Sequence, residues 1–299
     1  MLRVLKDRSS RPISKKVGKK KTASVKDGRA NGQLVELEPD DRLPRGYLSV
    51  SQINMYQRCP KQYEYRYIDG IKSPPTIALK EGSTHHDVME AVGVEFMKKR
   101  IVPVKTRIEM FCDLFSTHKK DIDKKEWAMS GCSPSDILNR GALLIEDYYA
   151  FERDNLKHIR PASQPEEKFE ILIGGVPVLG FIDTTTLGLG VIDYKVVSKC
   201  KSQSETDHDL QLTIYSAVKK NPLVGFMCFV KSKTPKVQLV QSRRSQKDFR
   251  YSKLLVSSVA DAIKKGAFPL CSPTGNYLCN ERWCGYWKMC RGKGTGGRR

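Results

Sequence analysis

The spacing of apolar residues in the first half of the chain predicts helices. Residues 49–68 carry apolar and aromatic side chains at helical intervals, with a serine at the start as N-cap and Pro60 as a break, so we expect two short helices that meet at Cys59. Further along, Ser133 is a predicted N-cap, and Pro134 is the first residue of its helix. The longer predicted helices span residues 80–99, 105–115 and 134–156.

Short β-rich runs replace the helical pattern from residue 168 onward. The pair Gly174-Gly175 and the segment Gly188-Leu189-Gly190 separate the first three runs, which is typical of strands joined by hairpins. The predicted strands span residues 169–173, 177–186, 189–197, 223–230 and 236–242, and the predicted helices span residues 206–220 and 246–265. This order predicts an α/β core with a central mixed β-sheet flanked by helices and preceded by a helical lobe.

The composition is that of an ordinary soluble protein. The 299 residues are 39% hydrophobic, and no apolar run reaches the roughly 18 to 20 residues that a membrane span needs. The N-terminus also lacks the apolar block of a secretory signal. We therefore expect no membrane partner and a location in the cytoplasm, which would be the host cytoplasm if the protein is viral.

The formal charge of +20 is concentrated toward the two ends of the chain. Residues 1–42 are rich in Lys, Arg, Ser and Gly, which predicts a disordered basic arm, and residues 291–299 form a short basic tail. Such segments attract polyanions by releasing condensed counterions, so nucleic acid is the expected partner. For the arm, a purely solubilising role and organellar targeting are the alternatives.

Two aspartates and a lysine form the first candidate site. Asp193 and Lys195 lie two residues apart on a predicted strand, so their side chains share one face, and Tyr194 points to the other. Asp183 ends the preceding strand and approaches the same face if the two strands pair. Carboxylates are the ligands that Mg²⁺ or Mn²⁺ prefers, and a lysine beside them suits a phosphate. A solvated surface pattern is the alternative.

These residues belong to a wider pattern that resembles the RecB-like branch of the PD-(D/E)XK nucleases. The pattern comprises G-x-I-D ending at Asp183, V-I-D-Y-K ending at Lys195, an upstream G-x-x-x-H ending at His86, and a later helix with Q-x-x-x-Y. It extends over residues 48–290, most of the folded chain. The resemblance implies a restriction-endonuclease-like core with a divalent metal ion at its active site.

The resemblance also implies a role for each residue of the pattern. The ligands of Mg²⁺ or Mn²⁺ would be His86, Asp183 and Asp193. Lys195 would be catalytic together with the two aspartates, and Gln211 and Tyr215, four apart on one helix face, would position the lysine or the DNA backbone. A glutamate near the first strand is also expected, with candidates Glu166, Glu167 and Glu170.

Cysteines are concentrated near the C-terminus. A disulfide framework is not expected in a reducing compartment. A subset of the similar nucleases carries a 4Fe-4S cluster held by one cysteine ahead of the histidine motif and three near the C-terminus. The corresponding ligands here would be Cys59, Cys279, Cys284 and Cys290. Cys271 competes with Cys279 for this role, and Zn²⁺ or free thiols are the alternatives to the cluster.

The expected function is that of a divalent-metal-dependent DNA nuclease. The resemblance favours an exonuclease acting on single strands or duplex ends in recombination, repair or replication, and it extends to the CRISPR adaptation nucleases; the sequence indicates no particular helicase or recombination partner. A non-catalytic nucleic-acid-binding module and a zinc-stabilised basic scaffold are the alternatives. The expected nuclease domain spans residues 43–290, with a helical lobe (47–160), a catalytic core (161–268) and a cysteine segment (269–290).

Overall fold

The computed structural model describes residues 38–292 of the chain. Most of the predicted basic arm (1–42) and of the basic tail (291–299) therefore lies outside the described residues. Across the described range, we find no helix that combines the length and the apolar character required to cross a membrane.

Helices occupy the chain up to the first strand, as the apolar spacing predicts. They are α1 (Val50–Arg58), α2 (Pro60–Tyr63), η1 (Glu64–Ile68), α3 (Ile77–Met97), α4 (Val104–His118), η2 (Lys119–Asp121), α5 (Lys124–Ser130), α6 (Pro134–Asp154) and α7 (Leu156–Ile159). The helices α1 and α2 meet at Cys59, and Ser133 caps α6 by accepting a hydrogen bond from the Asp136 amide (3.2 Å), so both predictions are confirmed. The helices α5 and α7 were not predicted because they are too short to show a clear period.

Two sheets follow the helical lobe. The strands β1 (Glu167–Ile173) and β2 (Val176–Ile182) form an antiparallel hairpin through Gly174 and Gly175, which both have positive φ. The second sheet has the strand order β3 (Thr184–Thr185), β4 (Val191–Val197), β5 (Leu223–Val230) and β6 (Lys236–Arg243). Only β4 and β5 are parallel within it, so the predicted mixed α/β class is confirmed. The single predicted strand 177–186 is wrong, because a bend at Asp183 divides it into β2 and β3.

The helix predicted over residues 206–220 is also divided. Helix α8 (Gln203–Asp207) has His208 as its C-cap. Helix α9 (Leu210–Lys219) begins after Asp209, which caps it by accepting a hydrogen bond from the Leu212 amide (2.9 Å). This local capping bond overrides the continuous apolar period that suggested one helix. The last helices are α10 (Gln246–Lys264), close to its prediction, and the π-helix η3 (Lys288–Gly292).

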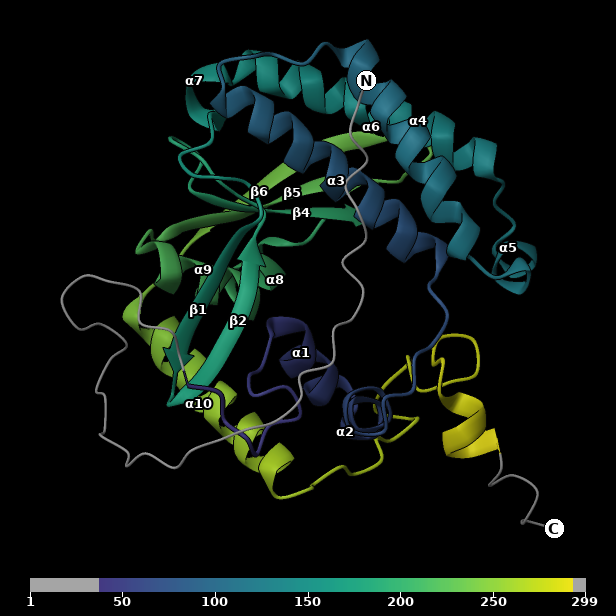
Figure 1. Cartoon of the computed structure of the whole chain (residues 1–299), viewed down its shortest axis with the longest axis vertical. Coiled ribbons are helices and arrows are strands. Elements are labelled where there is room, and N and C mark those ends of the chain that lie inside the picture. The colour runs from purple at the N-terminus through teal and green to yellow at the C-terminus, as the bar shows by residue number, and fades with distance from the viewer. Residues whose placement is uncertain (1–37, 293–299) are drawn as a thin grey trace, which may run out of the picture. The chain divides into compact units, whose positions relative to one another are not determined.

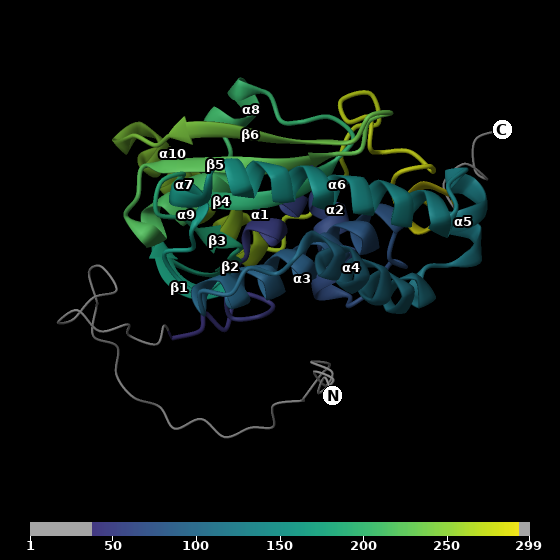
Figure 2. The same cartoon turned by 90° about the horizontal axis from the view of Figure 1, so that it is seen from above.

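The four-stranded sheet separates two hydrophobic cores. Helices α3, α4 and α6 cover one face of it, and α9 and α10 lie toward the other with the β1–β2 hairpin (Figures 1 and 2). Along β4, Val191 belongs to the core with α9 and α10, whereas Ile192 and Tyr194 belong to the core with α3 and α6. The side chains of Asp193 and Lys195 therefore lie on the same face of β4 as that of Val191, as the strand alternation predicts.

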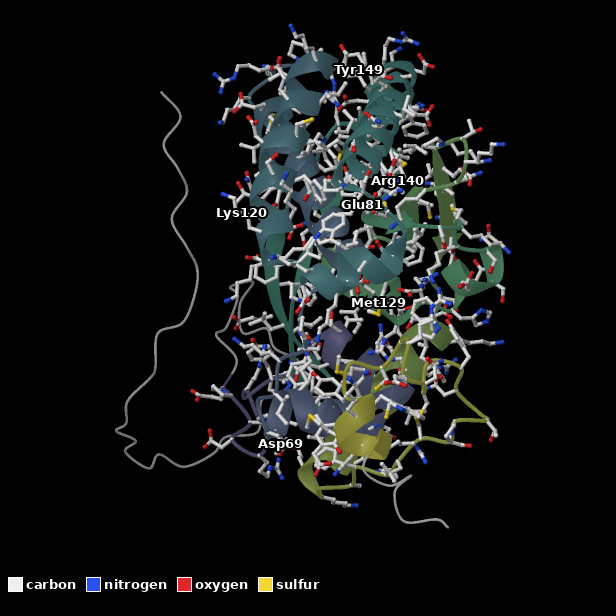
Figure 3. The ribbon with its side chains drawn as sticks, turned by 90° about the vertical axis from the view of Figure 1, so that its right-hand side faces the viewer. Asp69, Glu81, Lys120, Met129, Arg140 and Tyr149 are labelled. Carbon is white, nitrogen blue, oxygen red and sulfur yellow. The ribbon has the colours of Figure 1, made fainter. Side chains whose placement is uncertain are left out.

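A buried ion-pair network attaches α3 to its neighbours. Glu81 of α3 is fully buried, and its carboxylate lies 2.8 Å from Nε of Arg140 on α6 and 3.0 Å from Nζ of Lys231, which follows β5. Glu81 and Arg140 lie close together between the helices of the lobe (Figure 3). Because a buried carboxylate is tolerated only when cations offset its desolvation, these contacts fix the helix that carries His86 little more than one turn later.

Removing the Glu81 carboxylate should destabilise the protein. We expect Glu81→Ala to lower the free energy of unfolding by about 3 kcal/mol, because Arg140 and Lys231 would stay partly buried without their partner. The matched control is Glu146→Ala on the exposed face of α6, which should change stability by less than about 0.5 kcal/mol. Urea denaturation followed by circular dichroism measures both variants; equal midpoints would contradict a stabilising role for Glu81.

Candidate metal centre and active site

The candidate site lies where the short strand β3 leaves the edge of β4 open. Within the ladder, β3 pairs only with Val191 and Ile192. The next residue that faces this edge, Tyr194, bonds to side chains instead: its amide donates to Oδ2 of Asp183 (2.7 Å), and its carbonyl oxygen lies 2.9 Å from Nε2 of His86. The backbone of one β4 residue therefore holds Asp183 and His86 at the same point.

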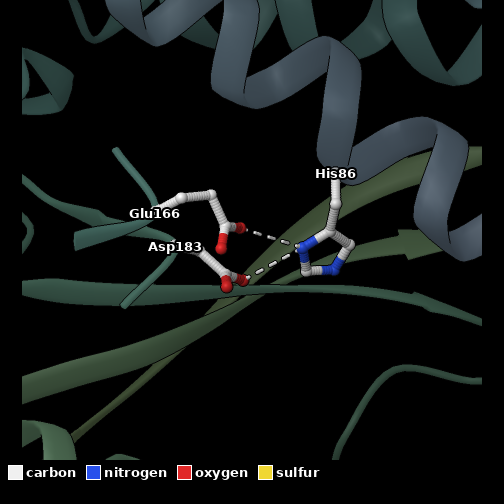
Figure 4. Close-up of side chains that lie close together, drawn as sticks. All are labelled: His86, Glu166 and Asp183. Carbon is white, nitrogen blue, oxygen red and sulfur yellow. Dashed lines mark ion pairs between the residues drawn. The ribbon is translucent and has the colours of Figure 1, made fainter. Parts of the chain in front are cut away.

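Three side chains converge at this point (Figure 4). Nδ1 of His86 lies 3.5 Å from Oδ2 of Asp183 and 3.8 Å from Oε1 of Glu166. One ligand atom from each of the three lies within 4.8 Å of the other two, a spacing that a bound cation can bridge. Helix α3 supplies the histidine. The two carboxylates come from neighbouring chain segments, because the Glu166 amide donates to the Asp183 carbonyl (3.1 Å) just beyond the β1–β2 ladder.

Of the three glutamates that the sequence leaves open, Glu166 is the one at the site. Glu167 forms an ion pair with Lys219 (2.7 Å), and Glu170 forms one with Lys168 (2.6 Å). Glu166 has a φ of 52°, in the left-handed region that residues other than glycine rarely adopt. Strained backbone of this kind is often found at functional sites. No pattern in the sequence marks this conformation, so the choice of Glu166 had to come from the structure.

The charges around His86 require a positive charge between them. Burial lowers the pKa of His86, but the carboxylates of Glu166, Asp183 and Asp193 outweigh it and raise the pKa to about 9. Burial and repulsion from Asp193 raise the pKa of Asp183 to about 8. If Nε2 of His86 donates to Tyr194, Nδ1 faces two carboxylates and needs a proton or a cation there. One imidazole nitrogen with carboxylate oxygens suits Mn²⁺ or Mg²⁺, so the residues fit the expected ion.

His85, the neighbour of His86, is a packing residue. It is fully buried, and its ring lies 4.6 Å from the ring of Phe111 and 5.2 Å from that of Phe229, between centroids. Burial lowers the pKa of His85 to about 3, so this imidazole stays neutral inside the lobe. The step of about 100° between successive helix residues therefore sends one histidine into the core and the other to the edge of β4.

Asp193 and Lys195 lie beside the three convergent side chains. Asp193 is fully buried, and its Oδ2 lies 2.6 Å from Nζ of Lys195. Burial lowers the pKa of Lys195, but the Asp193 charge more than reverses this effect, so the lysine stays charged. Neither Asp193 oxygen accepts a well-directed hydrogen bond from the described residues. Asp193 is outside the close group that contains Glu166, and Lys195 is the cation that offsets its charge in the described residues.

A chain of hydrogen bonds joins Lys195 to the two predicted positioning residues on α9. Nζ of Lys195 donates to Oε1 of Gln211 (3.1 Å), and Nε2 of Gln211 donates to the hydroxyl of Tyr215 (2.7 Å). The Tyr215 hydroxyl in turn donates to the carbonyl oxygen of Phe181 on β2 (2.5 Å). The structure thus connects Gln211 and Tyr215 with the lysine through directed contacts, and it extends the connection to β2.

The predicted cysteines surround a separate cavity of about 120 Å³. Its lining includes Cys59 between α1 and α2 together with Cys271, Cys279, Cys284 and Cys290. Burial and the nearby thiols of Cys279 and Cys59 raise the pKa of Cys271 to about 12. No three of these sulfur atoms lie within 4.8 Å of one another in the described residues. Thiolates are ligands for a single Zn²⁺ as well as for an iron–sulfur cluster, so the residues that line this cavity are chemically suited to either.

Comparison with known proteins adds a family and a fold. A family model described as the PD-(D/E)XK nuclease superfamily matches residues 47–291. The Gene 69 protein of Mycobacterium phage D29 is 28% identical over 211 residues, which cover 63% of this chain and 77% of that protein. The Gene 69 protein of Mycobacterium phage L5 is 26% identical over 204 residues, which cover 56% of this chain and 68% of that protein. The crystal structure of a candidate exonuclease from Eubacterium rectale has a TM-score of 0.50 and 14% identity, covering 75% of this chain and 83% of that one, which shows a shared fold.

Two adjacent glutamates provide a test of the metal centre. We expect Glu166→Gln to weaken Mn²⁺ binding by at least about tenfold, because an amide oxygen carries no charge to offset that of the ion. The control Glu167→Gln removes a carboxylate that faces Lys219 and should leave the affinity unchanged. Isothermal titration of each metal-free variant with Mn²⁺ measures the effect. Equal affinities for the two variants would exclude Glu166 as a ligand.

Proposed function

Because the chain belongs to the PD-(D/E)XK nuclease superfamily, we propose that it is a divalent-metal-dependent DNA nuclease, and specifically an exonuclease. We propose that it cleaves single strands or duplex ends of DNA during recombination, repair or replication. One observation carries the proposal: a histidine, two close carboxylates and an aspartate–lysine pair meet at one open sheet edge. Such an arrangement suits phosphodiester hydrolysis better than binding alone.

The region in front of the site supports access by a polyanion. An open hollow of about 500 Å³ lies between α3 and β4, and His86, Glu166 and Lys195 are among the residues that line it. The formal charge of +20 favours a nucleic acid over a neutral substrate. The basic arm would add affinity that does not depend on sequence, although most of it lies outside the described residues.

The residues have distinct chemical tasks in the proposed reaction. His86, Glu166, Asp183 and Asp193 would hold Mg²⁺ or Mn²⁺. When bound, the ion supplies a Lewis acid for the phosphate and lowers the pKa of water. Lys195 would stabilise the negative charge that develops on the phosphate, and Asp193 and Gln211 keep its ammonium in place through contacts of 2.6 and 3.1 Å. Tyr215 would position Gln211.

The exonuclease part of the proposal draws on the shared fold with the candidate exonuclease from Eubacterium rectale. A non-catalytic DNA-binding module is the competing function. It has no use for a fully buried carboxylate held against a half-buried lysine, because Asp193 is costly to bury and contributes nothing to binding duplex phosphates from outside. The intact set of Asp183, Asp193 and Lys195 therefore favours the enzyme.

Removing the lysine should separate catalysis from binding. We expect Lys195→Ala to lower the rate of DNA cleavage in Mg²⁺ or Mn²⁺ by at least about a hundredfold, since it removes a charge that acts in the transition state. Binding of DNA should remain nearly unchanged. Digestion of end-labelled single- and double-stranded DNA measures the rate, and EDTA should abolish it.

Lys199→Ala is the matched control for this experiment. Lys199 lies just after β4 and is exposed, so its loss changes the net charge equally without touching the site. It should cleave DNA at nearly the wild-type rate. Wild-type activity in Lys195→Ala, or the same loss in both variants, would contradict the assigned role of Lys195.

Labelled circular DNA distinguishes an exonuclease from an endonuclease. An exonuclease leaves the circle intact because it needs a free end, whereas an endonuclease cleaves it.

We also propose that Cys59, Cys279, Cys284 and Cys290 hold a 4Fe-4S cluster. The cavity that these residues line is supported by direct contacts between its two walls: the Asn276 side chain donates to the Arg58 carbonyl (2.8 Å), and that of Gln62 donates to Sγ of Cys284 (3.7 Å). Such a cluster would tie α1 and α2 to the C-terminal segment, so its binding energy would add to the folding energy.

The cluster has a visible signature. Protein purified without oxygen should be brown with broad visible absorbance, and Cys284→Ser should remove the colour and lower the melting temperature, because one of four thiolates is lost. Cys112→Ser on α4 is the control and should keep the colour. Elemental analysis distinguishes the alternatives, since stoichiometric zinc without iron would contradict the proposed cluster.

A further inference from the structure

Phe181 is an exposed aromatic residue two positions before Asp183 of the candidate metal centre. The residue is 43% exposed, whereas the adjacent Ile182 is fully buried. Phe181 is the penultimate residue of β2, and the bend at Asp183 follows directly after the strand. Because Phe181 and Asp183 are only two residues apart, their Cα atoms are at most roughly 7 Å apart, a span of about two base steps of 3.4 Å. A nucleic acid with its phosphate at the metal centre would therefore bring a nearby base to this ring.

The main chain of Phe181 is connected to the catalytic lysine. The hydrogen bonds from Lys195 to Gln211 (3.1 Å), from Gln211 to Tyr215 (2.7 Å) and from Tyr215 to the Phe181 carbonyl (2.5 Å) form one continuous relay. The relay ends on the backbone and does not involve the ring. It fixes where β2 presents the ring relative to Lys195 and leaves the aromatic face exposed to solvent.

A cation accompanies the ring on the same face of the hairpin. Lys168 on β1 is the cross-strand partner of Phe181; its side chain is 56% exposed and its ammonium also forms the ion pair with Glu170 (2.6 Å). Directly paired residues in an antiparallel hairpin have neighbouring side chains. An exposed ring beside a lysine is the combination with which proteins bind unpaired nucleotides, because the ring stacks on a base and the cation meets the backbone.

We propose that Phe181 forms a nucleobase subsite, on which an unpaired base close to the scissile phosphate stacks. This inference rests on the proposed nuclease function and specifies the form of its substrate: a single strand or a frayed duplex end, in which the base faces are available. The Gln211–Tyr215 pair acts as a positioning device that holds the subsite at a fixed distance from Lys195. Stacking needs no base-specific hydrogen bond, so the subsite accepts all bases.

Fluorescence of a base analogue tests the subsite without cleavage. Short single strands with 2-aminopurine at successive positions from each end are titrated with full-length wild-type protein in EDTA. Stacking on an aromatic ring quenches this fluorophore, so we expect strong quenching at one or two adjacent positions. Phe181→Ala should abolish this quenching and weaken single-strand binding by about 5- to 150-fold, which corresponds to about 1 to 3 kcal/mol for one stacked base.

Three variants distinguish stacking from other effects of the substitution. Phe181→Tyr keeps an aromatic face and should retain the quenching, whereas Phe181→Leu keeps apolar bulk and should lose it. Tyr251→Ala removes a 63% exposed ring on α10 and should behave as wild type. The salt dependence of binding should be the same in wild type and in Phe181→Ala, because no phosphate contact is removed.

The outcomes separate this inference from the proposed function. If wild-type protein binds and cleaves DNA, but Phe181→Ala shows the same affinity and quenching, the subsite does not exist and the nuclease function stands. Retained quenching in Phe181→Leu would likewise exclude aromatic stacking. Wild-type protein that neither binds nor cleaves DNA would contradict the nuclease function itself.

Discussion

Two of the candidate ligands, His86 and Asp183, are held in place by the backbone of Tyr194. A strand residue at a sheet edge normally donates to and accepts from a neighbouring strand, but β3 ends before it reaches this position. The Tyr194 amide and carbonyl therefore bond to Asp183 and His86. Buried backbone groups must be satisfied, so these two side chains are held as firmly as strand partners would be. The side-chain hydroxyl of Tyr194 also forms a hydrogen bond with the Tyr148 hydroxyl (3.1 Å), and this contact joins the site to α6.

The sequence was sufficient for the parts of the site that follow a regular period. Alternation on β4 placed Asp193 and Lys195 on one face, and helical spacing placed Gln211 and Tyr215 together on α9. The bend at Asp183 and the break before Asp209 could not be seen, because each depends on one side chain bonding to a particular backbone amide. The sequence could not show which of the three glutamates belongs to the site. Glu166 faces His86 with its backbone in the left-handed region, and a glutamate in the sequence does not predict that conformation.

The cysteine segment shows how distant parts of the chain reach one cavity. Tyr56 of α1 donates to the Ala267 carbonyl (2.5 Å), 211 residues away, and Tyr286 donates to the Ile71 carbonyl (2.9 Å), 215 residues away. Closing such long loops costs only slightly more than closing moderate ones, so a few directed contacts can hold the ends together. The resemblance in the cysteine pattern predicts that Cys59 and the C-terminal cysteines come together. The structure adds that Cys271 lines the same cavity, so five thiols surround it.

The open edge of β4 has a consequence for the protein in solution. An unpaired strand edge is a template on which another chain can add a strand, and such edges lead to aggregation unless they are blocked. Here Asp183 and His86 occupy the hydrogen-bonding groups that an incoming strand would need, and Glu166 and Lys195 place charge beside them. The residues that would perform hydrolysis thus also keep the sheet from growing between molecules, so selection for solubility and selection for catalysis act on the same side chains.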